Sequence, residues 1–160
     1  MTEPPDATPA DCPACRECRD FARSLGALEE IYAFVEPLFA SHRIGREATF
    51  ALIMTIEELF TNMVKYNPAG RGPISLEVQC AADAVTCQLS DPDSARFDMT
   101  RLPDVDIRQP VERRHPGGLG IHLIRRLVDS IDYDHAGRCS RVRFVRKLSA
   151  PARADHMQRQ

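Results

Sequence analysis

The 160-residue sequence lacks any apolar run of transmembrane length, and its first residues, 1–6, lack the pattern of a signal peptide. We therefore expect no membrane association and a cytoplasmic location. A surplus of positive charge is also missing, because 21 Lys and Arg stand against 23 Asp and Glu, a formal net charge of −2. Such a chain has no overall basic field, so we expect no direct nucleic-acid partner.

The sequence does contain enough apolar material for one domain, since 43% of its residues are hydrophobic. Residues 1–20 are rich in Pro, Ala, Asp and Cys and are predicted to be a flexible N-terminal extension. Residues 21–149 are predicted to form the folded domain, and residues 150–160 a disordered tail.

Hydrophobic periodicity predicts the elements of this domain. They are helices over residues 22–41 and 46–67, a hairpin of strands 74–80 and 85–89, a long loop over 99–116, a helix after Gly120, and strands near 130–134 and 141–148. This order predicts an α+β fold, a two-layer sandwich with its helices on one face of a mostly antiparallel, mixed sheet.

A glycine-rich segment, from His115 to Ile121, leads into the last predicted helix. Glycine lets the backbone come close to a ligand, and the first turn of a helix offers unpaired N–H groups and a positive dipole end to an anion. The segment therefore favours a phosphate-binding turn for a nucleotide, although paired glycines before a helix also suit an ordinary turn.

Polar residues form a narrow stripe on the otherwise apolar helix 46–67. Thr55, Glu58, Asn62 and Lys65 recur there at helical spacing. One interpretation is a solvated stripe with a contact between Glu58 and Asn62. The other is a functional pair, because a carboxylate can act as a general base and an amide oxygen one turn later can ligate a hard cation such as Mg²⁺.

In this order, the two motifs resemble the GHKL superfamily of ATPases and kinases, and within it the anti-sigma-factor serine/threonine kinases, over roughly residues 25–148. The resemblance implies a Bergerat-type, histidine-kinase-like fold with ATP and Mg²⁺ as cofactors. It also implies that Glu58 activates the attacking hydroxyl and that Asn62 holds Mg²⁺. The backbone of residues 117–120 would line the triphosphate, behind a lid over residues 109–116.

The family has a third motif, an Asp-x-Gly-x-x-Phe turn whose Asp contacts the adenine amino group, and here the match is incomplete. Residues 89–98 contain no glycine. Asp91 is the first choice for the adenine contact and Asp93 the alternative, while the same residues also suit an ordinary turn. The full set implied for nucleotide binding is Asn62, Lys65, Asp91, Asp93, Phe97, Arg114, Gly117, Gly118, Leu119 and Gly120.

Three cysteines, Cys12, Cys15 and Cys18, have the spacing C-x2-C-x2-C ahead of the predicted domain. Zinc or an iron–sulfur cluster usually takes four ligands, and no fourth one is obvious in the sequence. The cluster is therefore interpreted first as a set of reduced thiols in a flexible segment, and second as a metal or redox sensor.

By resemblance, the predicted function is that of an ATP-dependent protein serine/threonine kinase that acts as an anti-sigma factor in transcription regulation. It would bind a sigma factor and phosphorylate a serine of an antagonist protein. Two alternatives stay open. One is a nucleotide-binding module that sequesters a partner without catalysis, which the missing turn glycine favours, and the other is a thiol or metal sensor built on the cysteine cluster. The sequence is also compatible with a homodimer.

Overall fold

The computed structural model describes residues 15–98, 101 and 118–149. Within these residues the strands form one five-stranded sheet of order β1-β2-β3-β5-β4, in which every neighbouring pair is antiparallel. The elements are β1 Cys15–Phe21, the 3-10 turn η1 Leu25–Ala27, α1 Leu28–Ser41, α2 Arg46–Tyr66, β2 Ile74–Cys80, β3 Ala84–Asp91, α3 Gly118–Leu127, β4 Ser130–Ala136 and β5 Cys139–Lys147.

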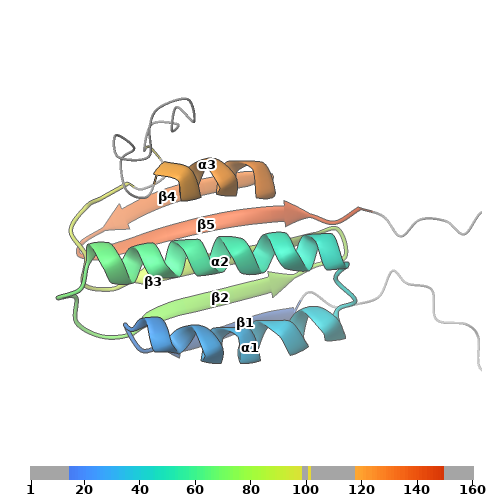
Figure 1. Ribbon diagram of the computed structural model, residues 1–160, viewed down its shortest axis with the longest axis horizontal. Coiled ribbons are helices and arrows are strands. Elements are labelled where there is room, and N and C mark those ends of the chain that lie inside the picture. The colour runs from blue at the N-terminus through green and yellow to red at the C-terminus, as the bar shows by residue number, and fades with distance from the viewer. Residues whose placement is uncertain (1–14, 99–100, 102–117, 150–160) are drawn as a thin grey trace, which may run out of the picture.

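Three α-helices cover one face of this sheet, with α2 between α1 and α3 (Figure 1). The predicted α+β sandwich is therefore confirmed, although the part of the chain that is described contains no parallel strand pair. None of the described helices combines the length and apolar character needed to cross a bilayer.

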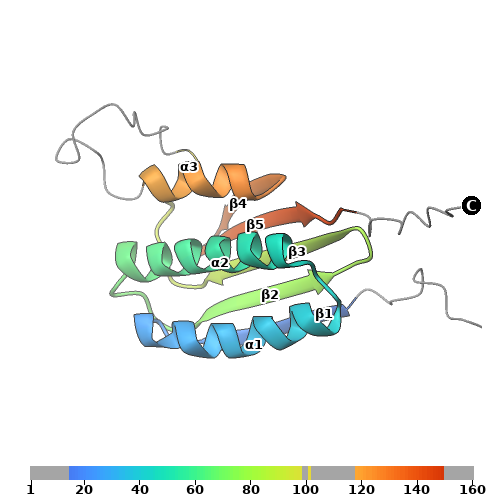
Figure 2. The ribbon, with the colours of Figure 1, turned by 45° about the vertical axis from the view of Figure 1, so that its right-hand side comes forward.

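Helix α2 runs through the centre of the helical layer, as Figure 2 also shows. Its predicted range of 46–67 is confirmed to within one residue. The helix ends before Pro68, whose ring disfavours helical geometry in the preceding residue, and Asn67 accordingly has φ −132° and ψ 59°. Buried apolar residues occur around much of its circumference, so the helix packs on several sides at once. These residues are Ala51, Leu52, Ile56, Leu59, Phe60 and Met63.

The hairpin of β2 and β3 confirms the predicted pair of strands and forms the middle of the sheet. Its buried apolar residues alternate along each strand and form the core with the helices; they are Ile74, Leu76, Val78, Cys80, Val85, Cys87 and Leu89. Strand β3 ends beside the C-terminus of α2. A hydrogen bond of 3.2 Å from Asn67 Nδ2 to Asp91 Oδ2 joins the two ends. The candidate site is built at this junction.

The first described residues depart from the prediction. Residues 15–20, predicted to belong to a flexible extension, form strand β1 together with Phe21 and pair with β2 along its whole length. The strand lies at the edge of the sheet, where only Phe21 is buried. A strand that exposes most of its side chains shows no apolar alternation, so periodicity misses it. Helix α1 also begins later than predicted, at Leu28 rather than at residue 22.

Candidate functional site

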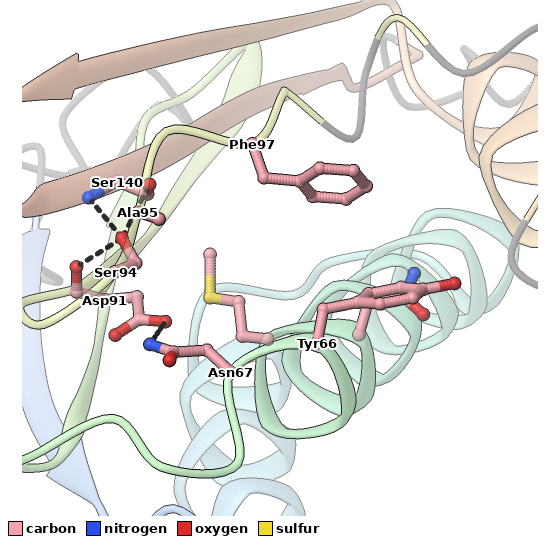
Figure 3. Close-up of a pocket in the computed structure, with 9 residues that line it drawn as sticks. Tyr66, Asn67, Asp91, Ser94, Ala95, Phe97 and Ser140 are labelled. Atoms are coloured by element: carbon pink, nitrogen blue, oxygen red, sulfur yellow. Dashed lines mark hydrogen bonds between the residues drawn. The ribbon is translucent and has the colours of Figure 1, made fainter.

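A cavity of about 460 Å³, including the open space at its mouth, lies where the C-terminal half of α2 meets the end of β3 and the start of β5. Figure 3 shows its lining, which comes from three parts of the chain. The lining residues are Asn62, Met63, Tyr66, Asn67, Asp91, Ser94, Ala95, Phe97 and Ser140. The sequence-based set contributes Asn62, Asp91 and Phe97 to this cavity.

The polar stripe of α2 turns inward at Thr55 and Asn62, whereas Lys65 at its end is exposed. Thr55 is buried and satisfies its hydroxyl by donating to Ala51 O at 2.7 Å within the helix. Asn62 is only 5% exposed, and its Nδ2 donates to Glu58 Oε1 at 3.2 Å. The predicted contact between Glu58 and Asn62 thus exists, but not on a solvated face. Because this bond uses the amide nitrogen, the carbonyl oxygen is the end of Asn62 that can ligate a cation.

Two consecutive carboxylates on α2 have different surroundings. Glu57 accepts a hydrogen bond from the hydroxyl of Tyr32 on α1 at 2.6 Å, so it joins two helices. Partial burial and this bond raise the pKa of Tyr32 to about 12. Glu58 is half-buried and contacts Asn62 instead. Neither acid is among the lining residues that the structure describes, but Glu58 is bonded to Asn62, which is one of them.

The N-terminus of α3 meets the acid of α2 directly. Helix α3 begins at Gly118, and a Cβ atom added at Gly120 would overlap the carboxyl group of Glu58. Glycine therefore lets the acid lie this close to the helix, because a side chain here would force the Glu58 carboxyl to move. The first N–H groups of a helix have no partner within the helix, so they are available to an anion. Glu58 and the start of α3, two features far apart in the sequence, thus lie side by side.

Asp91 is the buried carboxylate of the cavity, with 2% of its surface exposed. Both of its oxygens accept from the guanidinium of Arg23, at 2.6 and 3.1 Å, and Asn67 Nδ2 donates to one of them at 3.2 Å. Arg23 and Asn67 were not identified from the sequence. Nothing in the local pattern around Arg23 points to Asp91, because the two residues are 68 positions apart.

The alternative acid, Asp93, does not line the cavity. Its carboxylate accepts from Arg138 Nη2 at 2.6 Å and from the backbone N–H of Arg71 at 2.8 Å. The hydrogen bonds from Arg138, followed by that from Arg71, lower the pKa of Asp93. Of the two candidates for the adenine contact, the cavity therefore favours Asp91.

The turn after β3 forms without the glycine that the family pattern contains. Arg43 is the only non-glycine residue with positive φ among those the structure describes, so no residue from Asp91 to Asp98 needs a glycine-like conformation. Ser94 holds the turn instead: its Oγ donates to Ser140 Oγ at 2.7 Å and accepts from the Ser140 backbone N–H at 3.1 Å. The incomplete motif is thus compatible with an unstrained turn.

Two aromatic rings flank the mouth of the cavity. Phe97 and Tyr66 are 44% and 39% exposed, and their ring centroids lie 5.4 Å apart. The Tyr133 hydroxyl accepts from the backbone N–H of Phe97 at 3.0 Å and so fixes this part of the turn. Tyr66 was missed by sequence reasoning, although its position four residues after Asn62 places it on the same helix face.

The other candidates that the structure describes are not lining residues. Lys65 is exposed, and its Nζ lies 5.5 Å from the centroid of the Tyr66 ring. Gly118 and Leu119 belong to the first turn of α3. Arg114, Gly117 and the predicted lid over residues 109–116 lie outside the described residues.

The cysteine cluster does not converge in the described residues. Cys15 and Cys18 are three positions apart in β1, so their side chains point to opposite faces of the sheet. Cys15 lies opposite Cys80 in β2, whereas Cys18 is exposed. No group of three or more His, Cys, Asp or Glu side chains in the described part of the chain is placed to hold a metal ion. Cys12 lies outside that part.

A chelator is therefore expected to leave the thermal unfolding temperature of the protein unchanged, and elemental analysis to find less than one zinc per chain. Joint ligation by Cys15 and Cys18 would require β1 to leave the sheet and lose its pairing with β2. A Cys15→Ser/Cys18→Ser variant is the control. Stoichiometric zinc that is lost in this variant would contradict the prediction and favour a sensor role.

Comparisons with known proteins agree with this architecture. The RsbU and RsbW domains of Rv1364c from Mycobacterium tuberculosis share the fold, with a TM-score of 0.64 at 14% sequence identity. The match covers 87% of this chain and 33% of the other, so it spans only about a third of that two-domain chain. No curated protein matches the sequence.

The family comparison covers most of the chain. The model of the histidine kinase-like ATPase domain matches residues 21–146, a range that contains the whole cavity lining together with α2 and α3. This match agrees with the resemblance that the motifs on α2 and α3 indicate. The chain therefore belongs to the histidine kinase-like ATPase family.

Proposed function

We propose that the protein is an ATP-dependent protein serine/threonine kinase that acts as an anti-sigma factor. One observation carries the kinase part of this proposal: Glu58 of α2, which accepts a hydrogen bond from Asn62, lies against Gly120 in the first turn of α3. In these proposed roles, Glu58 as general base, Asn62 as cation ligand and the first amides of α3 as phosphate donors would act close together, as phosphoryl transfer requires. The histidine kinase-like ATPase family supports nucleotide binding there.

The cavity residues suit the parts of Mg-ATP. Asp91, an acceptor at its buried end, suits the adenine amino group, and the apolar faces of Met63 and Phe97 suit the ring. The Asn62 carbonyl oxygen is a hard ligand of the kind that Mg²⁺ takes. The first amides of α3 can donate to phosphate oxygens. ATP supplies the phosphoryl group, and Mg²⁺ neutralises its charge.

In the proposed reaction, Glu58 accepts the proton of a serine hydroxyl on the substrate protein. That hydroxyl oxygen forms the new bond to the γ-phosphorus, and the bond from phosphorus to the bridging oxygen of ADP breaks. The N–H groups that begin α3 stabilise the negative charge that develops on the phosphoryl oxygens. The protein contributes mainly position and electrostatics, because phosphoryl transfer needs little covalent chemistry from the enzyme.

The proposed partners are a sigma factor, which the protein would sequester, and an antagonist protein that carries the substrate serine. Two observations support this branch of the family. The motif pattern resembles the anti-sigma-factor kinases, and the fold matches a structure that includes an RsbW domain. Phosphorylation of the antagonist would then decide which partner is bound. We also propose that the protein can form a homodimer, which a measurement of its mass in solution would test.

The proposed function is tested first by isothermal titration of the full chain with ATP and ADP, with and without Mg²⁺. Transfer of labelled phosphate to a cognate antagonist is measured next. We expect ATP binding that Mg²⁺ strengthens, and label on a serine of the antagonist. A chain that does not bind ATP would contradict the whole proposal. Binding without transfer would instead support the non-catalytic sequestration module.

Asn62→Ala is expected to weaken Mg-ATP binding at least about tenfold, the scale on which even outer partners of a metal site matter. Binding of ATP without Mg²⁺ should change much less, because the variant removes the cation ligand but leaves Asp91 in place. Titrations in magnesium and in chelator give the two affinities.

Thr61→Ala is the matched control for Asn62→Ala, since Thr61 is the neighbouring residue on α2 and its hydroxyl donates to carbonyl groups of its own helix. It does not line the cavity. If Asn62→Ala weakened binding equally with and without Mg²⁺, the residue would be a direct nucleotide contact and not a cation ligand.

A further inference from the structure

Arg23 belongs to none of the sequence motifs and is not a lining residue, yet it bonds to both oxygens of Asp91, which is one. It lies in the short segment between β1 and η1, and its side chain is 7% exposed. Besides its two bonds to Asp91, its guanidinium approaches the carbonyl oxygens of Asn67 at 3.4 Å and Gly72 at 3.5 Å. One side chain thus joins the end of α2, the turn before β2 and the end of β3.

The surroundings of Arg23 leave it little freedom. A Cβ atom added at Gly70 would lie 2.6 Å from Arg23 Cζ and 2.5 Å from Asn67 Nδ2, so the turn after α2 packs directly on both groups. The paired side chains of Arg23 and Asp91 are 7% and 3% exposed. An ion pair buried to this extent contributes little net stability, because desolvation offsets the attraction. The effect of the ion pair at the site is instead to fix the orientation of the Asp91 carboxylate.

We propose that Arg23 is a positioning residue that sets the purine specificity of the cavity by holding the Asp91 carboxylate in a fixed orientation. The proposal rests on the proposed binding of ATP. The planar guanidinium bonds to both oxygens and so fixes the plane of the carboxylate, which a single-point cation would not do. Asn67 adds a third constraint from the end of α2.

The contacts of Asp91 also show how a base could be accepted. Its remaining donors are neutral and lie farther away, Asn67 Nδ2 at 3.2 Å and the Asp93 backbone N–H at 3.4 Å. A donor on a bound base can share or replace one of these bonds without breaking the ion pair, since charge-assisted bonds are the stronger ones.

The clamped carboxylate discriminates between purines because it is an acceptor only. The 6-amino group of adenine donates to it, whereas the 6-oxo group of hypoxanthine presents another acceptor and is repelled. A carboxylate held in one plane cannot turn away from the wrong base. Specificity of this kind depends on the unfavourable contact as much as on the favourable one. A change that lets the Asp91 carboxylate turn should therefore lower the affinity for ATP more than the affinity for ITP.

The test compares the affinities of the wild-type chain and its Arg23→Lys variant for ATP and ITP, by isothermal titration with Mg²⁺. The variant keeps the positive charge but loses the fork that bonds both oxygens. We expect it to bind ATP about 10- to 100-fold more weakly, the equivalent of one charge-assisted hydrogen bond, while ITP affinity changes little. The ratio of the two affinities then falls toward one.

Arg16→Lys is the matched control, because Arg16 pairs with Glu77 on the exposed part of the sheet, away from the cavity. Asn67→Ala provides a second variant in case Arg23→Lys does not fold. It removes the constraint that Asn67 places on Asp91, together with the bond to the Asp93 carbonyl oxygen, but leaves the ion pair, so the ratio should shift in the same direction by a smaller factor.

The outcomes separate this inference from the proposed function. A wild-type chain without ATP affinity contradicts the proposed function itself. A wild-type chain that binds ATP and ITP equally well retains the proposed function but overturns the role of Arg23. The same conclusion follows if a folded Arg23→Lys variant keeps the wild-type ratio, or loses both affinities by the same factor, as a purely structural residue would.

Discussion

Glu58→Ala is expected to slow phosphoryl transfer by about 10²- to 10⁴-fold, the usual contribution of a positioned general base, and to leave ATP affinity largely intact. The reason is its location. Glu58 is half-buried beside the cavity-lining residue Asn62: its Oε1 accepts from Asn62 Nδ2, and its carboxyl lies against Gly120. A proton acceptor there acts on the substrate hydroxyl and makes no required contact with the nucleotide.

Single-turnover transfer of labelled phosphate measures the rate in this variant, and titration with Mg-ATP measures affinity separately. Glu57→Ala is the matched control: it removes a carboxylate one position away, whose partner is Tyr32 on α1. It should lower stability slightly and leave the rate near that of the wild type. Glu58→Gln should be as slow as Glu58→Ala, because the amide keeps the shape but cannot accept the proton. Wild-type rates in either Glu58 variant would remove the general base from the mechanism.

Local patterns were sufficient for the elements that bury a regular stripe of apolar side chains. Helix α2 and the hairpin of β2 and β3 show clear 3.6- and 2-residue periods, and the structure has them within a residue or two of the predicted bounds. The contact between Glu58 and Asn62 could also be predicted from the sequence, because residues four apart share a helix face.

Contacts between distant segments could not be predicted in this way. Arg23 reaches Asp91 across 68 positions, and Ser94 bonds to Ser140 across 46. Both contacts join residues that look like ordinary turn or surface positions in the sequence, so no spacing rule identifies them. The bond between Ser94 and Ser140 becomes visible only when β3 and β5 are aligned in the sheet, which places Asp91 opposite Ser140.

Strand β1 was missed for a different physical reason. An edge strand has neighbours on one side only, and this one buries little besides Phe21. Its polar residues bond to residues of the neighbouring strand β2: Arg16 donates to Glu77, and Asp20 accepts from Ser75. In the sequence alone, these polar residues look like part of a solvated segment. The strand is stabilised by backbone hydrogen bonds to β2 and not by burial of its side chains. Backbone pairing does not depend on a particular amino-acid composition, so the sequence does not reveal it.

Gly120→Ala is expected to reduce phosphoryl transfer about as strongly as loss of Glu58, that is by about 10²-fold or more. The added methyl group would occupy the space of the Glu58 carboxyl, so either the acid turns away or α3 shifts from α2. Alanine favours a helix over glycine by up to about 1 kcal/mol, so thermal stability should fall little if at all. Lost activity in a stable protein would then locate the effect at the contact between Gly120 and Glu58.

The control for this substitution is Gly45→Ala, where an added Cβ meets nothing within 4 Å and activity should be unchanged. The double variant Gly120→Ala/Glu58→Ala tests the cause, because two changes that act on one contact are not additive. Its rate should equal that of Glu58→Ala alone, and its ATP affinity should recover if crowding by Glu58 had displaced α3. Additive losses would show that Gly120 acts independently of the acid, and a wild-type rate in Gly120→Ala would show that transfer does not depend on this close approach.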